Sequence, residues 1–300
     1  MSLELCGIPL AHPVINGSGT YDAIAAREAF GDELLERFPF SAFVSKTITP
    51  EPRAGNPPPR LWEEPGGMVN SIGLPNKGLE GFLAHDLPRL GELPVPLVVS
   101  VMATSTDQFA LLVERVGARD EVSALELNVS CPNVKSGLVV GESPEEAEAL
   151  LVAVRGLTGK PLIVKLTPNA DPVPVGLAAE RGGADALSLI NTLRRTPVHP
   201  ERGEPWLGAG SGGLSGPAIR QVALEQVGAV AGSVSIPVVG MGGISSGRDA
   251  FDLLAAGAKV VAVGTESFRD PAAAVRIVTE LRGELERVGG GPANLFSQIR

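Results

Sequence analysis

The chain is poor in cysteine. Its 300 residues include two cysteines, Cys6 and Cys131, which lie far apart in the sequence. A disulfide framework is therefore improbable, and a reduced, cytoplasmic setting is favoured. Two thiols also cannot supply the cysteine ligands that an iron–sulfur cluster usually needs, and we predict no metal site.

The chain also lacks an excess of basic residues and long apolar runs. The formal net charge is −9, with no cluster of lysine and arginine, so nucleic acid is excluded as an expected partner. No apolar run reaches the roughly 18 residues of a membrane span. The first residues do not show a basic region followed by an apolar one, so we expect neither a secretion signal nor a membrane attachment.

What the chain does have is a series of short, β-rich segments. Most are continuously apolar, as parallel strands buried on both faces usually are. We expect strands at eight places: Pro13–Asn16, Ser41–Lys46, Pro96–Val101, Ala124–Ser130, Leu162–Leu166, Ala186–Asn191, Ile236–Met241 and Val260–Thr265.

Helical patterns lie between these segments. Residues 145–154 have apolar side chains at helical spacing after Ser143 and Pro144, a typical helix start, and residues 246–256 repeat the pattern before Gly257. Residues 174–181 and 217–231 are similar. Eight alternating β and α units predict one (β/α)8 TIM barrel over residues 1–300, with an open doubly wound sheet as the alternative.

Two connections are too long for simple barrel loops. Residues 47–93 and 192–215 are rich in proline and glycine, and both follow the carboxyl end of an expected strand. In a barrel this end carries the catalytic face, and long loops there often act as lids or binding loops. We therefore expect long loops inserted at the C-terminal face.

Polar residues follow most of the expected strands. In a closed barrel these strand ends meet at one mouth. The most informative stretch is residues 128–133, which places the thiol of Cys131 between Asn128 and Asn133 just past a strand. A buried structural cysteine is the alternative for this stretch alone. Lys46 and Lys165 end two other strands, and several carboxamides in one place suit a cyclic amide or imide ligand.

The glycines after the last two strands predict a phosphate site. Gly242 and Gly243 follow one strand, and Gly264 and Thr265 follow the next. Glycine lets backbone N–H groups approach an anion, and we expect the helix that starts near Ser246 to add its positive dipole end. Two tight turns are the simpler explanation of each pair taken alone.

Two other glycine patterns do not support a dinucleotide-binding fold. Residues 208–213 match the glycine fingerprint formally, but no strand precedes them. Residues 240–245 follow a strand but lack the third glycine. We therefore expect no Rossmann-type NAD site in this chain.

The chain resembles the class 1 dihydroorotate dehydrogenases, barrel flavoenzymes of pyrimidine synthesis. The resemblance extends from about Leu3 to Phe268. It rests on these segments: residues 18–20 (SGT), 51–60 (EPRAGNPPPR), 70–76 (NSIGLPN), 128–133 (NVSCPN), 188–192 (SLINT) and 212–217 (GGLSGP). It implies FMN at the barrel mouth and oxidation of dihydroorotate to orotate.

The resemblance also implies which residues form the site. Residues implied to bind FMN are Ser18, Lys46, Thr47, Asn128, Lys165, Ile190, Gly216, Gly242, Gly243, Gly264 and Thr265. Residues implied to bind dihydroorotate are Lys46, Asn70, Ser71, Ile72, Gly73, Leu74, Asn128, Asn133, Asn191 and Thr192. Cys131 is implied to be the base that removes the C5 proton, with Lys165 stabilising negative charge on the reduced flavin.

Within this class the sequence is most similar to the NAD-linked class 1B subfamily. That subfamily works with a partner subunit carrying FAD and an iron–sulfur cluster, around a homodimer core. Residues 70–76 lean toward the fumarate-linked class 1A homodimers, so this second subfamily stays open. So do an NAD-linked dihydropyrimidine dehydrogenase, a catalytically silent subunit, and a barrel aldolase with Lys165 as Schiff-base amine.

Overall fold

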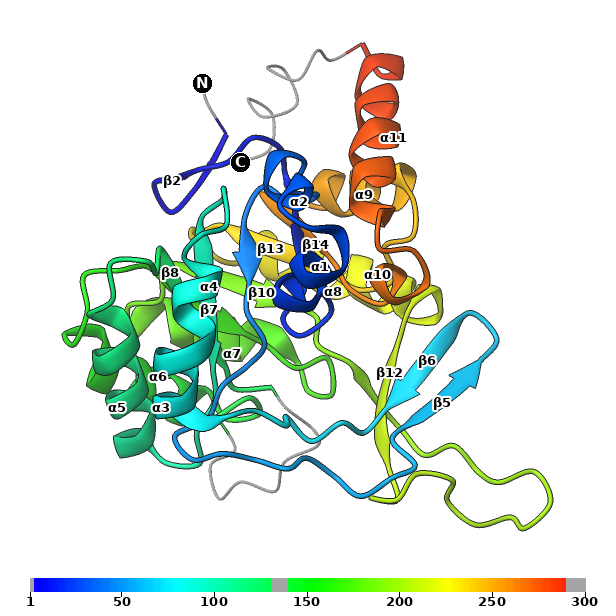
Figure 1. Cartoon of the computed structure of the whole chain (residues 1–300), viewed down its shortest axis with the longest axis horizontal. Coiled ribbons are helices and arrows are strands. Elements are labelled where there is room, and N and C mark those ends of the chain that lie inside the picture. The colour runs from blue at the N-terminus through cyan, green and yellow to red at the C-terminus, as the bar shows by residue number, and fades with distance from the viewer. Residues whose placement is uncertain (1–2, 131–139, 290–300) are drawn as a thin grey trace.

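The main body of the protein is an eight-stranded parallel barrel (Figure 1). The computed structural model describes residues 3–130 and 140–289. The strands follow one another around the barrel in chain order: β3 (Val14–Asn16), β4 (Phe43–Val44), β7 (Leu97–Val101), β8 (Ala124–Asn128), β9 (Leu162–Lys165), β10 (Ala186–Leu189), β13 (Val238–Met241) and β14 (Val260–Val263). All eight expected strands are confirmed, and so is the barrel.

A carboxamide side chain joins the first and second barrel strands. Asn16 is fully buried, its Oδ1 accepts a hydrogen bond of 2.8 Å from the Val44 N–H, and its Nδ2 donates one of 2.8 Å to the Val44 carbonyl. The Ser41 N–H also donates to the Val14 carbonyl at 3.1 Å. The side chain of Asn16 therefore replaces the backbone hydrogen bonds that a neighbouring strand would make with Val44, and it has a structural role at the strand end.

Helices cover the outside of the barrel. The longer ones are α1 (Ala23–Phe30), α5 (Thr106–Gly117), α6 (Pro144–Arg155), α7 (Pro172–Arg181), α8 (Arg220–Ala231), α9 (Gly247–Ala255) and α11 (Ala273–Arg287). The short ones are α2 (Glu33–Glu36), α3 (Gly78–Gly81), η1 (Phe82–Asp86), α4 (Leu87–Leu90), η2 (Pro217–Ile219) and α10 (Glu266–Arg269). The predicted starts are confirmed, because Ser143 caps α6 and Ser246 caps α9 through their hydroxyl oxygens.

The inside of the barrel is a separate apolar core. One side chain from each of several strands, including Ile15, Val98 and Ile163, points inward and is buried. A hairpin of β1 (Glu4–Leu5) and β2 (Ile8–Pro9) adds Leu3, Leu5 and Leu10 to this core. The barrel interior is thus filled with side chains, so a ligand has to bind at its mouth.

The two long connections are not simple loops. They form a four-stranded antiparallel sheet from β5 (Leu61–Glu64), β6 (Gly67–Asn70), β11 (Leu193–Arg195) and β12 (Gly212–Ser215). Figure 1 shows β5, β6 and β12 projecting to one side of the barrel. In its centre β6 pairs with β12, which joins the first connection to the second. The expectation of two separate insertions was therefore incomplete, since residues far apart in the chain build one sheet.

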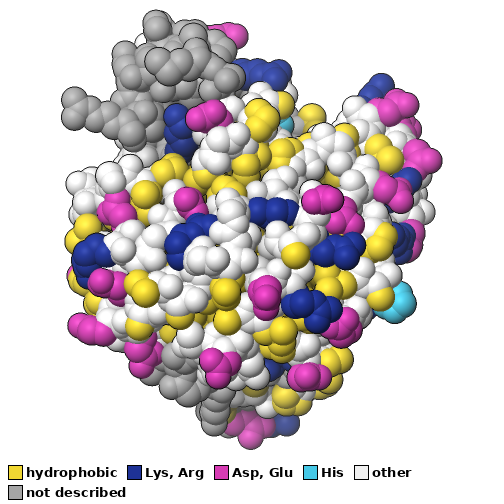
Figure 2. All heavy atoms as spheres, turned by 90° about the vertical axis from the view of Figure 1, so that its left-hand side faces the viewer, with side chains coloured by type: hydrophobic (Ala, Val, Ile, Leu, Met, Phe, Trp, Pro, Cys, Tyr) yellow, Lys and Arg dark blue, Asp and Glu magenta, His cyan; other side chains and the backbone are white. Residues whose placement is uncertain are grey.

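The exposed surface carries charges of both signs. On the face shown in Figure 2, acidic and basic side chains are interspersed with apolar ones, and neither sign forms a continuous patch. Among the described residues, no helix has both the length and the apolar character required to cross a membrane.

Candidate active site

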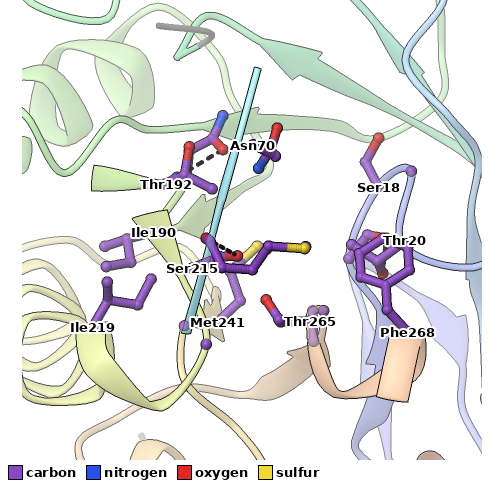
Figure 3. A pocket seen from close by; sticks show the side chains of 18 of the residues that line it. Ser18, Thr20, Asn70, Ile190, Thr192, Ser215, Ile219, Met241, Thr265 and Phe268 are labelled. Carbon is purple, nitrogen blue, oxygen red and sulfur yellow. Dashed lines mark hydrogen bonds between the residues drawn. The ribbon is translucent and has the colours of Figure 1, made fainter. Parts of the chain in front are cut away.

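A cavity of about 400 Å³ opens at the carboxyl ends of the barrel strands. Its floor comes from the strand ends and its cover from the antiparallel sheet, which contributes Met68 and Asn70 from β6 and Ser215 from β12. In Figure 3, Ile190 and Ile219 lie on one side of the cavity, opposite Ser18, Thr20 and Phe268. This volume is typical of pockets that hold a small molecule or cofactor.

The cavity brings together most of the residues expected from the sequence. All of those expected to bind FMN line it: Ser18, Lys46, Thr47, Asn128, Lys165, Ile190, Gly216, Gly242, Gly243, Gly264 and Thr265. Of those expected to bind substrate, these line it: Lys46, Asn70, Ile72, Gly73, Leu74, Asn128, Asn191 and Thr192. Ser71 does not, and Cys131 and Asn133 lie outside the described residues.

The hydroxyl of Thr47 is the centre of a polar network beneath the cavity. Thr47 Oγ1 lies 3.1 Å from Ser18 Oγ and 2.9 Å from Ser100 Oγ, and it accepts a hydrogen bond of 3.2 Å from Asn128 Nδ2. Ser18 in turn donates to the Ser45 carbonyl. Because these residues come from four different strand ends, the network fixes the strands relative to one another and orients Asn128.

The carboxamides of Asn128 and Asn191 are linked through a serine. Ser130 Oγ donates to Asn128 Oδ1 at 3.1 Å and accepts from Asn191 Nδ2 at 2.9 Å. Asn191 Oδ1 also accepts from the Thr192 N–H at 2.8 Å. The two amides are thereby held in defined orientations at the cavity wall, as recognition of a small polar ligand requires.

Asn56 supports the segment of residues 70–76 from behind. Its N–H donates to the Ile72 carbonyl, and its Nδ2 donates to Ser71 Oγ, each at 3.0 Å. Ser71 is fully buried by this contact, which explains why its side chain does not reach the cavity. Gly73 has a φ of +74°, and a Cβ there would lie 2.4 Å from Asn56 Oδ1, so only glycine fits.

Asn76 forms a turn. Its Oδ1 accepts from the Gly78 N–H at 2.8 Å, and its Nδ2 donates to the Leu74 carbonyl at 2.9 Å. The segment of residues 70–76 therefore ends in a fixed position beside the cavity.

The basic side chains among the described lining residues are Lys46 and Lys165. Burial lowers the pKa of Lys46 below its usual value, and the nearby Asp22 opposes this shift. Lys165 is almost completely buried, and its Nζ lies 3.8 Å from Glu126 Oε1. Two lysines that line one cavity favour a ligand that carries negative charge.

The glycines after β13 allow close packing against the start of α8. Gly242 and Gly243 have φ values of +124° and +77°, and a Cβ on Gly243 would lie 2.6 Å from the Arg220 Cβ. These two glycines, together with Gly264 and Thr265, line one end of the cavity. They leave backbone rather than side chains on this wall, which suits a bulky anion such as a phosphate.

The expected contribution of α9 to this phosphate site is not supported. The Gly247 N–H donates to Glu280 Oε2 at 2.7 Å, and Asp249 Oδ2 accepts from the Ser245 N–H at 3.0 Å. Burial raises the pKa of Asp249, but hydrogen bonds from Ser245 and Ser246 and the charge of Arg220 outweigh it, so the pKa lies below its usual value. The start of α9 is thus already bound by two carboxylates of the chain itself.

Sequence reasoning included Asn70 but missed the other lining residues that the antiparallel sheet and α10 contribute. Met68 and Ser215 reach the cavity because β6 and β12 fold over it, and Leu61 and Phe268 lie exposed at its rim. The turn signal Pro65–Gly66 between two alternating segments could have identified the β5–β6 hairpin. Nothing local indicates the pairing of β6 with β12.

Among the described residues, no group of three or more histidine, cysteine, aspartate or glutamate side chains is arranged to hold a metal ion.

A sequence model of the family described as dihydroorotate dehydrogenase matches residues 1–285. The chain belongs to the dihydroorotate dehydrogenase family. Two curated relatives named dihydroorotate dehydrogenase B (NAD(+)), catalytic subunit, support this. The one from Desulforudis audaxviator is 42% identical over 96% of this chain and 93% of that protein. The one from Trichlorobacter lovleyi is 45% identical over 92% and 90%.

A solved structure supports the fold of this dihydroorotate dehydrogenase family member. The dihydroorotate dehydrogenase of Eimeria tenella, crystallised with ferulenol, superposes with a TM-score of 0.79 at 24% identity. The match covers 99% of this chain and 87% of the other. At this level of identity the likeness shows the barrel fold alone.

Proposed function

We propose that this protein oxidises dihydroorotate to orotate in pyrimidine synthesis, with FMN bound in the barrel mouth and electrons passed on to NAD. The observation that carries this proposal is the single cavity in which the glycine-lined wall, two lysines and several carboxamides converge. Family membership and the names of the curated relatives support the same reaction.

The residues present fit FMN. At one end of the cavity, Gly242, Gly243, Gly264 and Thr265 leave space and backbone groups for the phosphate. Beyond them the wall is apolar, with Ile190 and Met241 among its residues, as a flat ring system requires. Thr47, Asn128 and Lys165 supply hydrogen bonds and positive charge at the floor.

The cavity wall that carries the carboxamides fits dihydroorotate. Asn70, Asn128 and Asn191 can each donate and accept, which matches the alternating N–H and C=O groups of a cyclic imide. Lys46 supplies an ammonium group for the carboxylate of the substrate. The hydrogen bonds from Ser130 and Asn56 keep this wall preorganised before the substrate arrives.

The reaction removes a proton from C5 and a hydride from C6 of dihydroorotate. Bound FMN would supply the acceptor for the hydride. Cys131, which follows Ser130 directly, is proposed as the base for the proton, because a thiolate is a usable base near neutral pH. Lys165 provides positive charge at the floor, where it would stabilise the negative charge of the reduced flavin.

Electrons leave through a partner subunit in this proposal. The curated relatives are named as catalytic subunits of an NAD-linked enzyme, which implies a second subunit. Leu61 and Phe268 are 50% and 57% exposed at the cavity rim, where a partner could approach the bound flavin. We propose that this partner carries FAD and an iron–sulfur cluster and that the catalytic chains form a homodimer core.

Anaerobic reduction tests the reaction and its acceptor together. Dihydroorotate should bleach the flavin absorbance of the purified protein, and NAD should restore it only when the partner subunit is present. Reoxidation by fumarate alone would assign the fumarate-linked class. Reduction by dihydrouracil but not by dihydroorotate, or a purified protein that binds no FMN, would reject the proposal. Borohydride trapping of a substrate on Lys165 would support an aldolase instead.

A Cys131→Ala variant tests the base. It should lose most of its turnover and keep its flavin, because the proposed base contacts the substrate and not the phosphate. Unchanged turnover would assign the proton transfer to another group or make the chain a silent subunit.

A further inference from the structure

A buried carboxylate lies beneath the cavity in the centre of the barrel. Glu126 is in the middle of β8, and its side chain is 4% exposed. Its Oε2 accepts a hydrogen bond of 3.0 Å from Ser188 Oγ on β10. Its Oε1 has no hydrogen-bond partner among the described residues and lies 3.8 Å from Nζ of Lys165 on β9.

The register of the sheet explains how these three residues meet. Asn128 on β8 is opposite Lys165 on β9, and Ser188 on β10 is opposite the same lysine. The long side chains of Glu126 and Lys165 therefore turn toward each other inside the barrel. Lys165 lines the cavity, whereas Glu126 does not, so the carboxylate lies on the inner side of the ammonium.

Stability alone does not account for this pair. Removing two charges from water costs about as much as their attraction returns, and apolar residues of similar size usually serve a core equally well. The hydrophobic core residues of β8 are Ala124, Leu125 and Leu127. A charged pair at this place is therefore best explained by what it does to the group that faces the cavity.

We propose that Glu126 is a positioning residue for Lys165: held by Ser188, its carboxylate fixes the ammonium at the cavity floor and compensates part of the charge felt by the ligand. This inference rests on the proposed function, because it concerns the flavin bound there. Glu126 thereby limits how strongly the site favours the negatively charged, reduced form of FMN.

The test uses the full-length, FMN-loaded protein with Glu126→Gln. This change keeps the shape and a partner for Ser188 but removes the negative charge, so the lysine charge is no longer compensated. The equilibrium constant for two-electron reduction of bound FMN should rise about tenfold, which corresponds to a potential about 30 mV more positive. The dissociation constant for sulfite, whose flavin adduct is anionic, should fall by a similar factor.

The matched control is Glu64→Gln. Glu64 is likewise paired with a basic side chain, Arg195 at 3.4 Å, but it is only partly buried and lies on β5, outside the barrel. The control should leave both the potential and the sulfite affinity within twofold of the wild type. The proposal is overturned if Glu126→Gln also stays within twofold, or if it lowers the potential.

A second comparison applies if Glu126→Gln does not hold flavin. Lys165→Met leaves the carboxylate buried and unpaired, so it should lower the thermal unfolding midpoint more than the double variant Lys165→Met with Glu126→Gln does. A double variant less stable than Lys165→Met would overturn the pairing. Failure of the wild type to bind FMN would reject the proposed function, whereas this stability comparison would still test the pair.

Discussion

Replacement of Asn16 by alanine should destabilise the whole barrel. The Asn16 side chain makes both hydrogen bonds to the backbone of Val44, and both residues are buried. Alanine leaves the Val44 N–H and carbonyl without these partners, at about 1–3 kcal/mol for each group. The expected loss in the free energy of unfolding is therefore about 2–6 kcal/mol, or a midpoint lower by roughly 5–15 °C.

Urea and thermal unfolding of the purified protein measure this effect. Asn56→Ala is a graded control, because its side chain makes one hydrogen bond, to Ser71, and its loss should cost about 1 kcal/mol. An Asn16→Ala variant no less stable than Asn56→Ala would refute the idea that a side chain closes the sheet between β3 and β4. The remaining backbone contacts, such as the hydrogen bond from the Ser41 N–H to the Val14 carbonyl, would then be enough to hold β3 and β4 together.

Three further predictions concern pH and the substrate wall. Burial, together with Arg282, lowers the pKa of His12 from 6.5 to about 4, so the unfolded chain binds a proton first as pH falls. Stability should therefore fall between pH 6.5 and 4 by at most about 3 kcal/mol, and His12→Gln should remove this slope in urea titrations. Lys46→Met should raise KM for dihydroorotate about 10- to 100-fold, as loss of a charged hydrogen bond does, and unchanged KM would exclude it as the carboxylate partner. Asn56→Ala should raise KM more than it lowers kcat in steady-state assays, with flavin content unchanged; equal losses in both would indicate a general structural defect.

The barrel itself could be predicted because its information is local. Each strand is a short apolar run, and each following helix carries its own start signal, such as Ser143 before Pro144. Parallel strands connected by helices then have few arrangements open to them. The polar residues at the strand ends follow from the same register, which is why most of the expected site residues line one cavity.

The pairing of β6 with β12 in the antiparallel sheet could not be predicted because it is not local. Gly213 pairs with Asn70, and the two residues are far apart in the chain. Gly213 has no room for a side chain, since a Cβ would lie 1.9 Å from Thr192 Oγ1. The glycines of residues 208–213, which look like a dinucleotide fingerprint, therefore include positions that serve close packing over the cavity.

Ser71 shows where residue-by-residue inference from a motif stops being sufficient. It belongs to a segment whose neighbours Asn70 and Ile72 line the cavity, yet its own side chain points to Asn56. In extended backbone, successive side chains point to opposite sides, so a continuous motif must contain residues that support the site without contacting the ligand. A sequence motif therefore identifies both the residues that line the cavity and the residues that support them from outside it.

Glu126 illustrates the same rule inside the barrel. One charged residue among the apolar residues of Ala124–Leu127 is unusual for a strand buried on both faces, and the sequence alone could have marked it for attention. Its partner could not be named in advance, because Lys165 and Ser188 come from the two following strands and meet it only through the register of the sheet. The groups expected to contact a ligand lie at the strand ends, where polar residues are easy to recognise in the sequence. The carboxylate that we propose to position Lys165 lies two residues before the end of its strand. A search for functional residues in a barrel should therefore include charged side chains in the middle of its strands.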